Sequence, residues 1–300
     1  MNQPLEQPSQ HPTGPRPGHA DSGAAALRAG LQAGHFRLQY QPQFSLATHE
    51  VIGAEALLRW RDPQRGSVSP AEFIPQAEAS GFIVELGGWV LETAVAQMPQ
   101  WRREGVELPV AVNVSVLQLQ QPGFFRDVIR ALERHQVPAG ALELEVTESR
   151  LLEDDPVVRE NLEALAAHGV RWAVDDFGAG YCGLSVLRRV PLTRLKLDRS
   201  FVQHLPGSRT DAALLQAVLR MAHVLGAEVL VEGVETTAQH EAVSAAGCQA
   251  AQGFLYSTPM EADSLPAFLV AHRQAAQPAA EPWLPGTLRP SLPVQPSLIG

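Results

Sequence analysis

The chain has 300 residues, of which 45% are hydrophobic, so it can form one large domain with a substantial core. Its formal net charge of −9 argues against sequence-independent binding to polymeric DNA or RNA, which depends on clustered lysine and arginine. The two cysteines form no disulfide framework or zinc motif, and there is no signal peptide or membrane-spanning run, so we expect a cytoplasmic protein that does not enter a membrane.

The two ends of the chain differ in composition from the part between them. Residues 1–22 are rich in proline and poor in large apolar side chains, so this segment is expected to be a disordered leader. Residues 275–300 repeat the pattern and are expected to be a flexible tail. The folded domain is therefore expected to span residues 23–274.

Between these ends, short β-branched runs alternate with amphipathic stretches. In chain order, the apolar runs predict strands at Arg37–Gln43, Val51–Arg59, Val110–Val114, Leu142–Thr147, Arg171–Asp175, Arg194–Leu197, Val229–Val231 and Ala250–Phe254. The amphipathic stretches predict helices at Trp89–Arg102, Gly123–Arg134, Pro156–His168, Asp211–Leu225 and Thr237–Ala245. About eight strands alternating with helices predict an α/β fold, a TIM-like (β/α)₈ barrel, whose functional residues lie at the carboxyl ends of the strands.

Polar side chains recur at the ends of these predicted strands. They are Glu55, Asn113, Glu145 with Glu148, Asp175 with Asp176, Lys196 with Asp198, and Glu232 with Glu235. A buried carboxylate is costly unless another group compensates for its desolvation, so a convergent set predicts a bound cation. Hard oxygen donors without cysteine favour Mg²⁺ or Mn²⁺, and Ca²⁺ is expected to inhibit because its coordination shell is larger and looser.

Several of these residues also have ordinary structural interpretations. An isolated pair such as Asp175 and Asp176 is more often a turn or a helix cap, but the other strand-end acids favour a metal site. Lys196 lies in an apolar run and could extend to solvent, yet beside acids it is expected to offset their repulsion and orient an attacking water, supported by Asp198. Arg59 could be a surface strand residue, although its guanidinium suits a phosphate oxygen.

The order of these blocks closely resembles the EAL-domain family of cyclic-di-GMP phosphodiesterases. The resemblance runs from Leu27 to Val270 and rests on Glu55-Ala56-Leu57 followed by Leu58-Arg59-Trp60, Asn113-Val114-Ser115, Glu145-Val146-Thr147-Glu148, Asp175-Asp176-Phe177-Gly178, Lys196-Leu197-Asp198, Glu232-Gly233-Val234-Glu235 and Gln252-Gly253-Phe254. It implies a modified barrel with an antiparallel first strand, hydrolysis of cyclic-di-GMP to linear pGpG with two metal ions, and a homodimer.

The resemblance also implies roles for individual residues. Glu232 would be the general base and Lys196 would orient the same hydroxide. The metal ligands would be Glu55, Asn113, Glu145, Asp175, Asp176 and Glu232. The substrate contacts would be Gln41, Leu57, Arg59, Asp198, Glu235 and Gln252.

The chain departs from the family in the loop that follows the aspartate pair. The family commonly has Gly-Tyr-Ser-Ser-Leu, whereas this chain has Gly180-Tyr181-Cys182-Gly183-Leu184. Glu148 is implied to steady this loop, and Cys182 replaces a hydroxyl with a thiol, a poorer hydrogen-bond donor. Because the metal ligands are retained, an active phosphodiesterase is favoured over a catalytically weak module that binds cyclic-di-GMP or an unidentified signalling partner.

Overall fold

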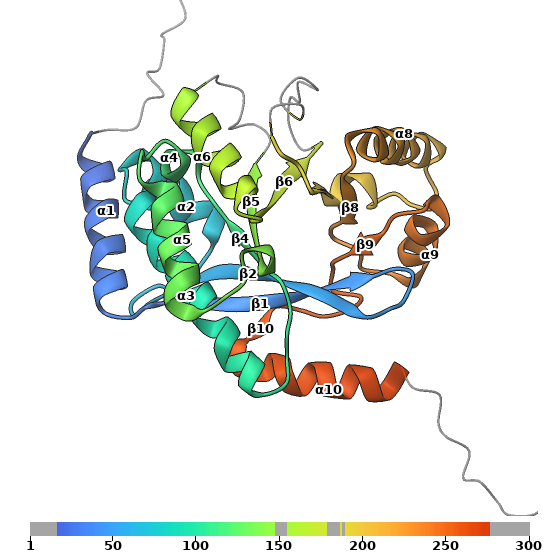
Figure 1. Ribbon diagram of the computed structural model, residues 1–300, viewed down its shortest axis with the longest axis horizontal. Helices are drawn as coiled ribbons and strands as arrows, with labels where there is room; N and C mark the ends of the chain where they lie inside the picture. Colours follow the sequence, from blue (N-terminus) through green and yellow to red (C-terminus); the bar gives the residue numbers. More distant parts are fainter. Residues whose placement is uncertain (1–16, 148–154, 179–186, 188–189, 277–300) are drawn as a thin grey trace, which may run out of the picture.

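The computed structural model describes residues 17–147, 155–178, 187 and 190–276, and the features below concern those residues. They form one sheet surrounded by helices (Figure 1). The strands are β1 (Phe36–Ser45), β2 (Val51–Asp62), β3 (Gly66–Val68), β4 (Val110–Asn113), β5 (Leu142–Thr147), β6 (Arg171–Phe177), β7 (Arg194–Leu197), β8 (Glu228–Val231), β9 (Ala250–Ala251) and β10 (Met260–Glu261).

The sheet closes on itself through β1. Its order is β10-β1-β9-β8-β7-β6-β5-β4-β2-β3, and an additional pairing joins β1 to β2. The strands from β2 through β4 to β9 pair in parallel, whereas β1 is antiparallel to both β2 and β9. The prediction of a TIM-like barrel with an antiparallel first strand is confirmed, and β3 and β10 are short additions outside the ring.

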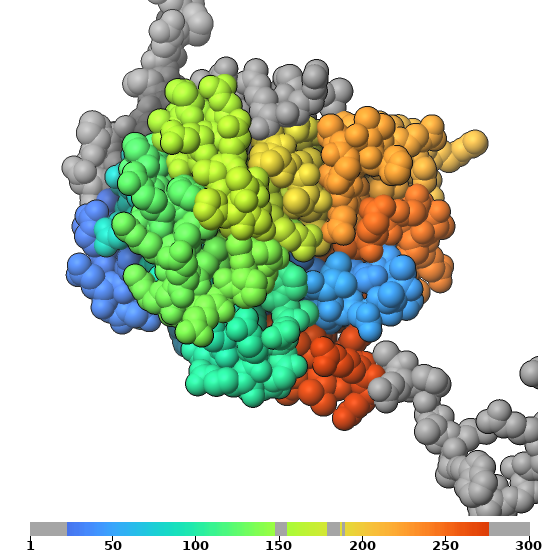
Figure 2. Space-filling model, in the orientation of Figure 1, coloured from blue at the N-terminus to red at the C-terminus, as the bar shows by residue number. Residues whose placement is uncertain are grey.

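Helices cover the outside of the barrel. α3, α5 and α6 lie beside β4 and β5, α8 and α9 lie on the side of β8 and β9, and α10 lies below β1 and β10 (Figure 1). Side chains close the spaces between the ribbons into a continuous outer surface (Figure 2). The helices are α1 (Pro17–Gln32), α2 (Pro70–Ala79), α3 (Ile83–Arg103), α4 (Val116–Leu119), α5 (Phe124–His135), α6 (Pro156–Ala167), α8 (Arg209–Leu225), α9 (Thr237–Ala246) and α10 (Leu265–Ala276).

The helical periodicity in the sequence explains how these helices pack. In α5, for example, Phe124, Val128, Ala131 and Leu132 are buried at the spacing of one helix face. No helix in the described part of the chain has both the length and the apolar character that a membrane span requires.

The observed elements differ from the predicted ones near both ends of the chain. α1 begins at Pro17, within the range 1–22 expected as a leader, and its Leu27 is fully buried in a cluster with Phe36, Trp60 and Phe73. α2 and α10 were not predicted, and α10 extends to Ala276. Tertiary burial of one apolar side of α1 therefore stabilises a stretch whose composition alone did not indicate a helix.

Two further boundaries differ from the predicted ones near glycines. α3 begins at Ile83 rather than at Trp89 and so includes Gly87 and Gly88. β9 ends at Ala251 rather than at residue 254, and the chain then bends at Gly253, which packs so closely on the backbone of Val234 that a Cβ would overlap it.

The adjacent glycines of α3 allow a matched test of the packing. Gly88 is exposed with open space around its Cα, so Gly88→Ala should stabilise the protein by about 0.5–1 kcal/mol through helix propensity. A Cβ on Gly87 would overlap the amide of Gln118, which accepts a hydrogen bond from Ser115 N at the start of α4, so Gly87→Ala should destabilise it by about 1–3 kcal/mol. Urea denaturation would measure both, and equal stabilisation by the two substitutions would contradict the packing.

Candidate functional site

Strands on opposite sides of the barrel direct five carboxyl groups into one site. Glu145 on β5 is the register partner of Asn113 at the end of β4. Asp175 on β6 is the register partner of Thr147 at the end of β5. Glu232 follows β8 directly. Glu55 was interpreted as a strand-end acid, but it lies in the middle of β2, as it does in the predicted strand Val51–Arg59, because β2 goes on pairing with β1 as far as Trp60.

Lys196 lies at the centre of this group and its side chain is fully buried. Its Nζ is 2.7 Å from Glu145 Oε2, 2.8 Å from Glu232 Oε1, 3.1 Å from Asp175 Oδ1 and 3.2 Å from Glu55 Oε2. One ammonium therefore contacts carboxylates from four different strands or strand ends. Lys196 therefore lies among acids that the sequence analysis had grouped with it.

A bulge brings Asp176 to the same site as Asp175. Neighbouring residues in a regular strand point to opposite faces of the sheet. Here the β6–β7 register shifts between Val174 and Phe177, and Asp176 has a φ of 54° while its N–H donates to Asp175 Oδ1 at 2.9 Å. As a result, carboxylate oxygens of Asp175, Asp176 and Glu232 all lie within 4.8 Å of one another.

Amide side chains hold Glu55 in place. Asn113 Nδ2 donates to Glu55 Oε1 at 2.8 Å, and Gln252 Nε2 donates to Glu55 Oε2 at 2.8 Å. Burial raises the pKa of Glu55, but the charge of Lys196 and these two hydrogen bonds outweigh it, so the net pKa is lowered. Glu55 is therefore an anion even in this buried position.

The other carboxyl groups have raised pKa values. Burial, and then the charge of Glu55, raise the pKa of Glu145 well above its ordinary value. Burial raises the pKa of Glu232 to about 8, despite the opposing charge of Lys196. Burial and the neighbouring Asp175 raise the pKa of Asp176 to about 6. The single ammonium of Lys196 does not neutralise so many acids, and additional positive charge would stabilise their ionised forms.

The donor set fits divalent cations. Carboxylate oxygens of Glu55, Glu145 and Asp175 lie within 4.8 Å of one another, as do those of Asp175, Asp176 and Glu232, so Asp175 is common to two possible metal sites. Glu145 Oε1 is buried and has no hydrogen-bond partner among the described residues. An all-oxygen set of this kind suits Mg²⁺ or Mn²⁺.

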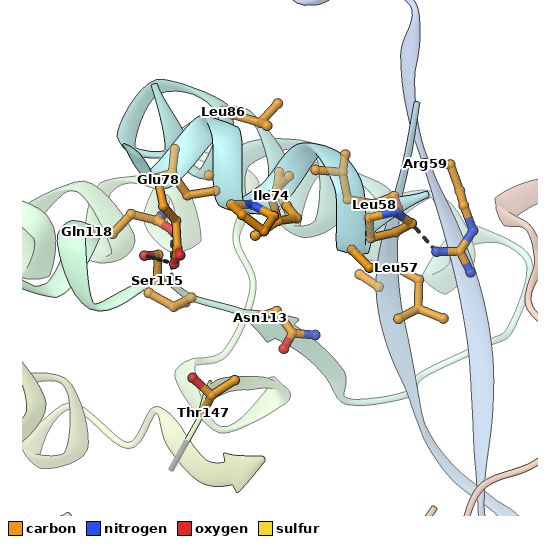
Figure 3. Close-up of a pocket in the computed structure, with 18 of the residues that line it drawn as sticks. Leu57, Leu58, Arg59, Ile74, Glu78, Leu86, Asn113, Ser115, Gln118 and Thr147 are labelled. Atoms are coloured by element: carbon orange, nitrogen blue, oxygen red, sulfur yellow. Dashed lines mark hydrogen bonds between the residues drawn. The ribbon is translucent and has the colours of Figure 1, made fainter. Parts of the chain in front are cut away.

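Two cavities open beside these acids. The first, which we name the β2–α2 cavity, has a volume of about 480 Å³ and is bordered by Asn113 and Asp176. Its walls are mainly apolar, with Leu57 and Arg59 at one end and Glu78, which accepts a hydrogen bond from Ser115, at the other (Figure 3). A pocket that combines apolar walls with a few polar groups is typical of a ligand site.

The second cavity, the β8–β9 cavity, has a volume of about 300 Å³ and is bordered by Glu55, Asp175 and Glu232. Leu57 borders both cavities. Phe254 lines the second one and remains 64% exposed, so it offers an aromatic surface at the mouth.

The structure brings most of the predicted substrate contacts to these cavities. Arg59 borders the β2–α2 cavity, whereas Gln41, Glu235 and Gln252 border the β8–β9 cavity. Asp198 borders neither, and its carboxylate accepts a hydrogen bond from Ser200 N at 2.9 Å at the start of a short 3₁₀ helix. The predicted loop residues Glu148 and Cys182 lie outside the described residues.

Sequence reasoning missed Arg199, which lines the β8–β9 cavity. It follows Asp198 in the 3₁₀ helix Arg199–Phe201, so no strand periodicity marks it, and only its adjacency to a predicted site residue could have drawn attention to it. Arg199 gives this cavity a basic side chain, as Arg59 does for the first.

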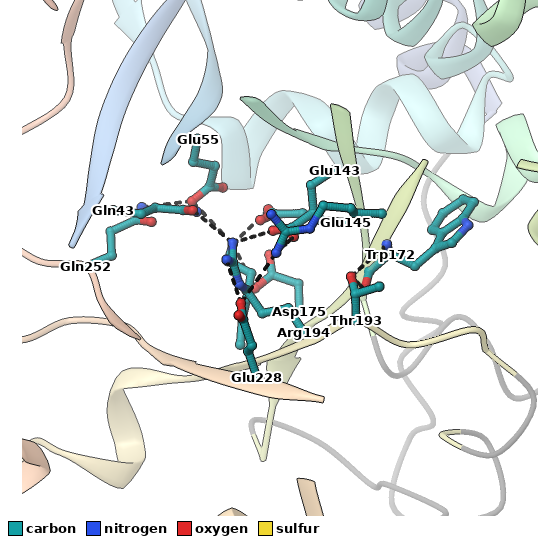
Figure 4. Close-up of polar contacts among 12 residues, drawn as sticks. Gln43, Glu55, Glu143, Glu145, Trp172, Asp175, Thr193, Arg194, Glu228 and Gln252 are labelled. Atoms are coloured by element: carbon teal, nitrogen blue, oxygen red, sulfur yellow. Dashed lines mark hydrogen bonds and ion pairs between the residues drawn. The ribbon is translucent and has the colours of Figure 1, made fainter. Parts of the chain in front are cut away.

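A second polar layer inside the barrel was also missed. Arg194 Nη1 contacts Glu143 Oε1 at 2.7 Å and Gln43 Oε1 at 3.1 Å, and its Nη2 contacts Glu228 Oε2 at 3.0 Å (Figure 4). Glu143 and Arg194 precede Glu145 and Lys196 by two residues on β5 and β7, so the strand period of two could have placed them on the same inner face. We name these four residues the basal layer.

Comparisons with known proteins place this chain in a family. A family model described as EAL domain matches residues 24–259. MucR of Pseudomonas aeruginosa, a bifunctional diguanylate cyclase/cyclic di-GMP phosphodiesterase, is 42% identical over 240 residues, which are 80% of this chain and 35% of that protein. A cyclic di-GMP phosphodiesterase of the same organism is 42% identical over 230 residues, 77% of this chain and 39% of that protein. The chain thus spans well under half the length of these relatives.

A solved structure gives a more complete match. The PaMucR phosphodiesterase in complex with c-di-GMP has 41% sequence identity and a TM-score of 0.76, and the match covers 81% of this chain and 99% of that one. The fold described above is therefore shared along almost the whole of that structure.

The raised pKa values predict that metal binding depends on pH. Below about pH 8 Glu232 holds a proton in the metal-free protein, as Asp176 does below about pH 6, and each must lose it to bind a cation. Mn²⁺ affinity should therefore rise as the pH is raised from 6 to 8, by about tenfold per unit for each proton displaced. Calorimetry in buffers of different ionisation enthalpy would count the released protons. An affinity that is constant over this range would contradict the prediction.

Proposed function

Because this chain belongs to the EAL domain family, we propose that it hydrolyses cyclic di-GMP to linear pGpG in a reaction that requires two divalent metal ions, Mg²⁺ or Mn²⁺. The observation that carries the proposal is the convergence of Glu55, Glu145, Asp175, Asp176 and Glu232 around Lys196. Relatives whose names describe cyclic di-GMP phosphodiesterases support the choice of substrate.

The two overlapping groups of acids divide the proposed metal ligands. Glu55, Asn113, Glu145 and Asp175 would hold one ion, and Asp175, Asp176 and Glu232 the other. Asn113 can present its side-chain oxygen after rotation of its amide. When bound, two such ions lower the pKa of an attacking water and stabilise the charge that develops on the phosphate.

Glu232 is the proposed general base. Burial raises its pKa to about 8 in the metal-free site, and bound cations would favour its ionised form, which can accept a proton from an attacking water. Lys196 contacts Glu232 Oε1 at 2.8 Å and so fixes the direction of the carboxylate that takes the proton. The raised pKa of Lys196, which the surrounding carboxylates produce against the effect of burial, keeps it charged in this role.

The two cavities support a substrate with two similar halves. Each opens beside the acids and each has one arginine, Arg59 in the β2–α2 cavity and Arg199 in the β8–β9 cavity. Guanidinium groups bind phosphate oxygens and guanine edges well, and exposed Phe254 offers a surface on which a base can stack. Leu57, which borders both cavities, would lie under the sugar-phosphate ring.

We also propose that the protein acts as a homodimer in the cytoplasm. On α8, Leu214 and Val224 are 53% and 83% exposed, and burial against a second copy would remove this apolar surface from water. The absence of a disulfide pattern in the sequence supports a reducing compartment.

The first test is an assay for the product and its metal requirement. The purified chain, incubated with cyclic di-GMP and Mg²⁺ or Mn²⁺, should yield pGpG that chromatography separates from the substrate. EDTA should abolish turnover and Ca²⁺ should inhibit it, because Ca²⁺ has a larger and more flexible coordination shell. Full activity after exhaustive chelation would disprove the metal requirement. Binding of cyclic di-GMP without any turnover would instead identify a receptor.

A second test separates binding from chemistry. Glu232→Gln should lower kcat by at least about a hundredfold, as expected on loss of a general base, while much of the substrate affinity remains. Glu228→Gln is the matched control, because Glu228 lies on the same side of the barrel in the basal layer and contacts Arg194 rather than Lys196. The control should retain turnover within about twofold of the wild type. Near-normal turnover by Glu232→Gln would mean that another group activates the water.

A further inference from the structure

Two buried glutamines form a hydrogen-bonded chain that ends on Glu55. Gln252 Nε2 donates to Glu55 Oε2 at 2.8 Å and to Gln41 Oε1 at 3.0 Å. Gln41 Nε2 in turn donates to the carbonyl oxygen of Ser257 at 3.0 Å. Gln252 and Gln41 are only 4% and 7% exposed, so these amide groups are largely committed to contacts within the protein.

We propose that Gln41 and Gln252 are positioning residues that orient Glu55 as a metal ligand, in place of the substrate contacts that the family resemblance implied for them. This inference rests on the proposed metal-dependent function. It assigns the two glutamines to the acid cluster although both also border the β8–β9 cavity.

The position of Gln41 and Gln252 in the barrel explains why Glu55 needs such support. The ring closes at β1, which is antiparallel to β9 on one side and to β2 on the other. Gln41 on β1 is the direct register partner of Glu55 on β2, and Gln252 follows β9. The three side chains therefore lie side by side on β2, on β1 and directly after β9, where the barrel closes. Glu55 projects there from the middle of a strand and has no strand-end loop to orient it.

The backbone of Gln252 also fixes the segment that carries Glu232. Gln252 N donates to Val231 O at 2.8 Å, and Val234 N donates to Gln252 O at 3.2 Å, so these bonds flank Glu232 on both sides. Gly253 permits the close approach, because a Cβ there would overlap the backbone of Val234. Gln252 thus connects Glu55 through its side chain with Glu232 through its main chain, and these two acids belong to the two different groups of proposed ligands.

The amide chemistry suits this role. Gln252 Nε2 has two hydrogens and uses both, one for Glu55 and one for Gln41. A glutamate in its place would add another negative charge to the acid cluster, and an apolar residue would leave Glu55 Oε2 with Lys196 alone. Hydrogen-bond donors that orient a ligating side chain commonly change metal affinity by about ten- to a hundredfold when they are removed.

The test measures metal binding and substrate binding separately. Mn²⁺ is titrated by calorimetry into the substrate-free full chain, as wild type, Gln252→Leu and Gln41→Leu. The Mn²⁺ Kd should rise about ten- to a hundredfold for Gln252→Leu and by a smaller factor for Gln41→Leu, which acts through Gln252. At saturating Mn²⁺, the KM for cyclic di-GMP should stay within about twofold of the wild type, because neither amide would contact the substrate.

Gln43→Leu is the matched control for damage to the barrel. Gln43 lies two residues from Gln41 on the same inner face of β1 and is as deeply buried, but it contacts Arg194 in the basal layer. This variant is expected to lose thermal stability and to keep the Mn²⁺ Kd within about twofold of the wild type.

Three results would overturn the inference. An unchanged Mn²⁺ Kd with a KM at least about tenfold higher in Gln252→Leu would make the glutamines substrate contacts. An equal loss of Mn²⁺ affinity in Gln43→Leu would mean that any disturbance of the barrel interior has the same effect. A wild-type chain that binds no Mn²⁺ would overturn the proposed function together with the positioning role, and so differs from the first two results.

Discussion

The contact of one buried ammonium with four carboxylates is the constraint on which the site depends. Lys196 is fully buried and reaches Glu55, Glu145, Asp175 and Glu232, which come from β2, β5, β6 and the end of β8. A single charge left unpaired in such a position costs about 3–5 kcal/mol, so the cation and the acids stabilise one another only as a group. The barrel must therefore bring these strands together at the same level, and its parallel register does so.

The carboxyl groups respond differently to this shared environment because their hydrogen bonds differ. Glu55 receives two amide donors in addition to Lys196 and has a lowered pKa. Glu145 is equally buried but has one oxygen without a partner among the described residues, and its pKa is raised. The local donors thus lower the pKa of Glu55, whereas burial raises the pKa of the other acids, so that a cation and protons compete for them.

Much of the fold and most of the acid cluster followed from the sequence, because strand periodicity and strand-end polarity are local signals. The inclusion of Asp176 beside Asp175 was also predicted, but its cause, a bulge with a positive φ at Asp176, has no local signal in the sequence. The predicted strand Val51–Arg59 already had Glu55 in its middle, so the interpretation of Glu55 as a strand-end acid was wrong, and the continued pairing of β2 with β1 as far as Trp60 is a tertiary contact. α1 was missed for a similar reason, because its burial against Trp60 and Phe73 is a tertiary contact.

The polar interior of the barrel is divided into two levels with different charge balance. In the basal layer, Glu143 and Glu228 face Arg194, and Arg171 Nη2 also lies 3.3 Å from Glu143 Oε2, so two acids meet two guanidinium groups. At the upper level one ammonium faces five carboxyl groups, and only this level borders the two cavities described above. The excess of negative charge therefore occurs beside the two cavities, whereas acidic and basic groups are balanced in the basal layer. We therefore expect substitutions in the basal layer to change mainly the stability of the barrel, and substitutions in the upper level to change its affinity for cations. The stability of the fold and the binding of cations thus depend on different residues of the same barrel.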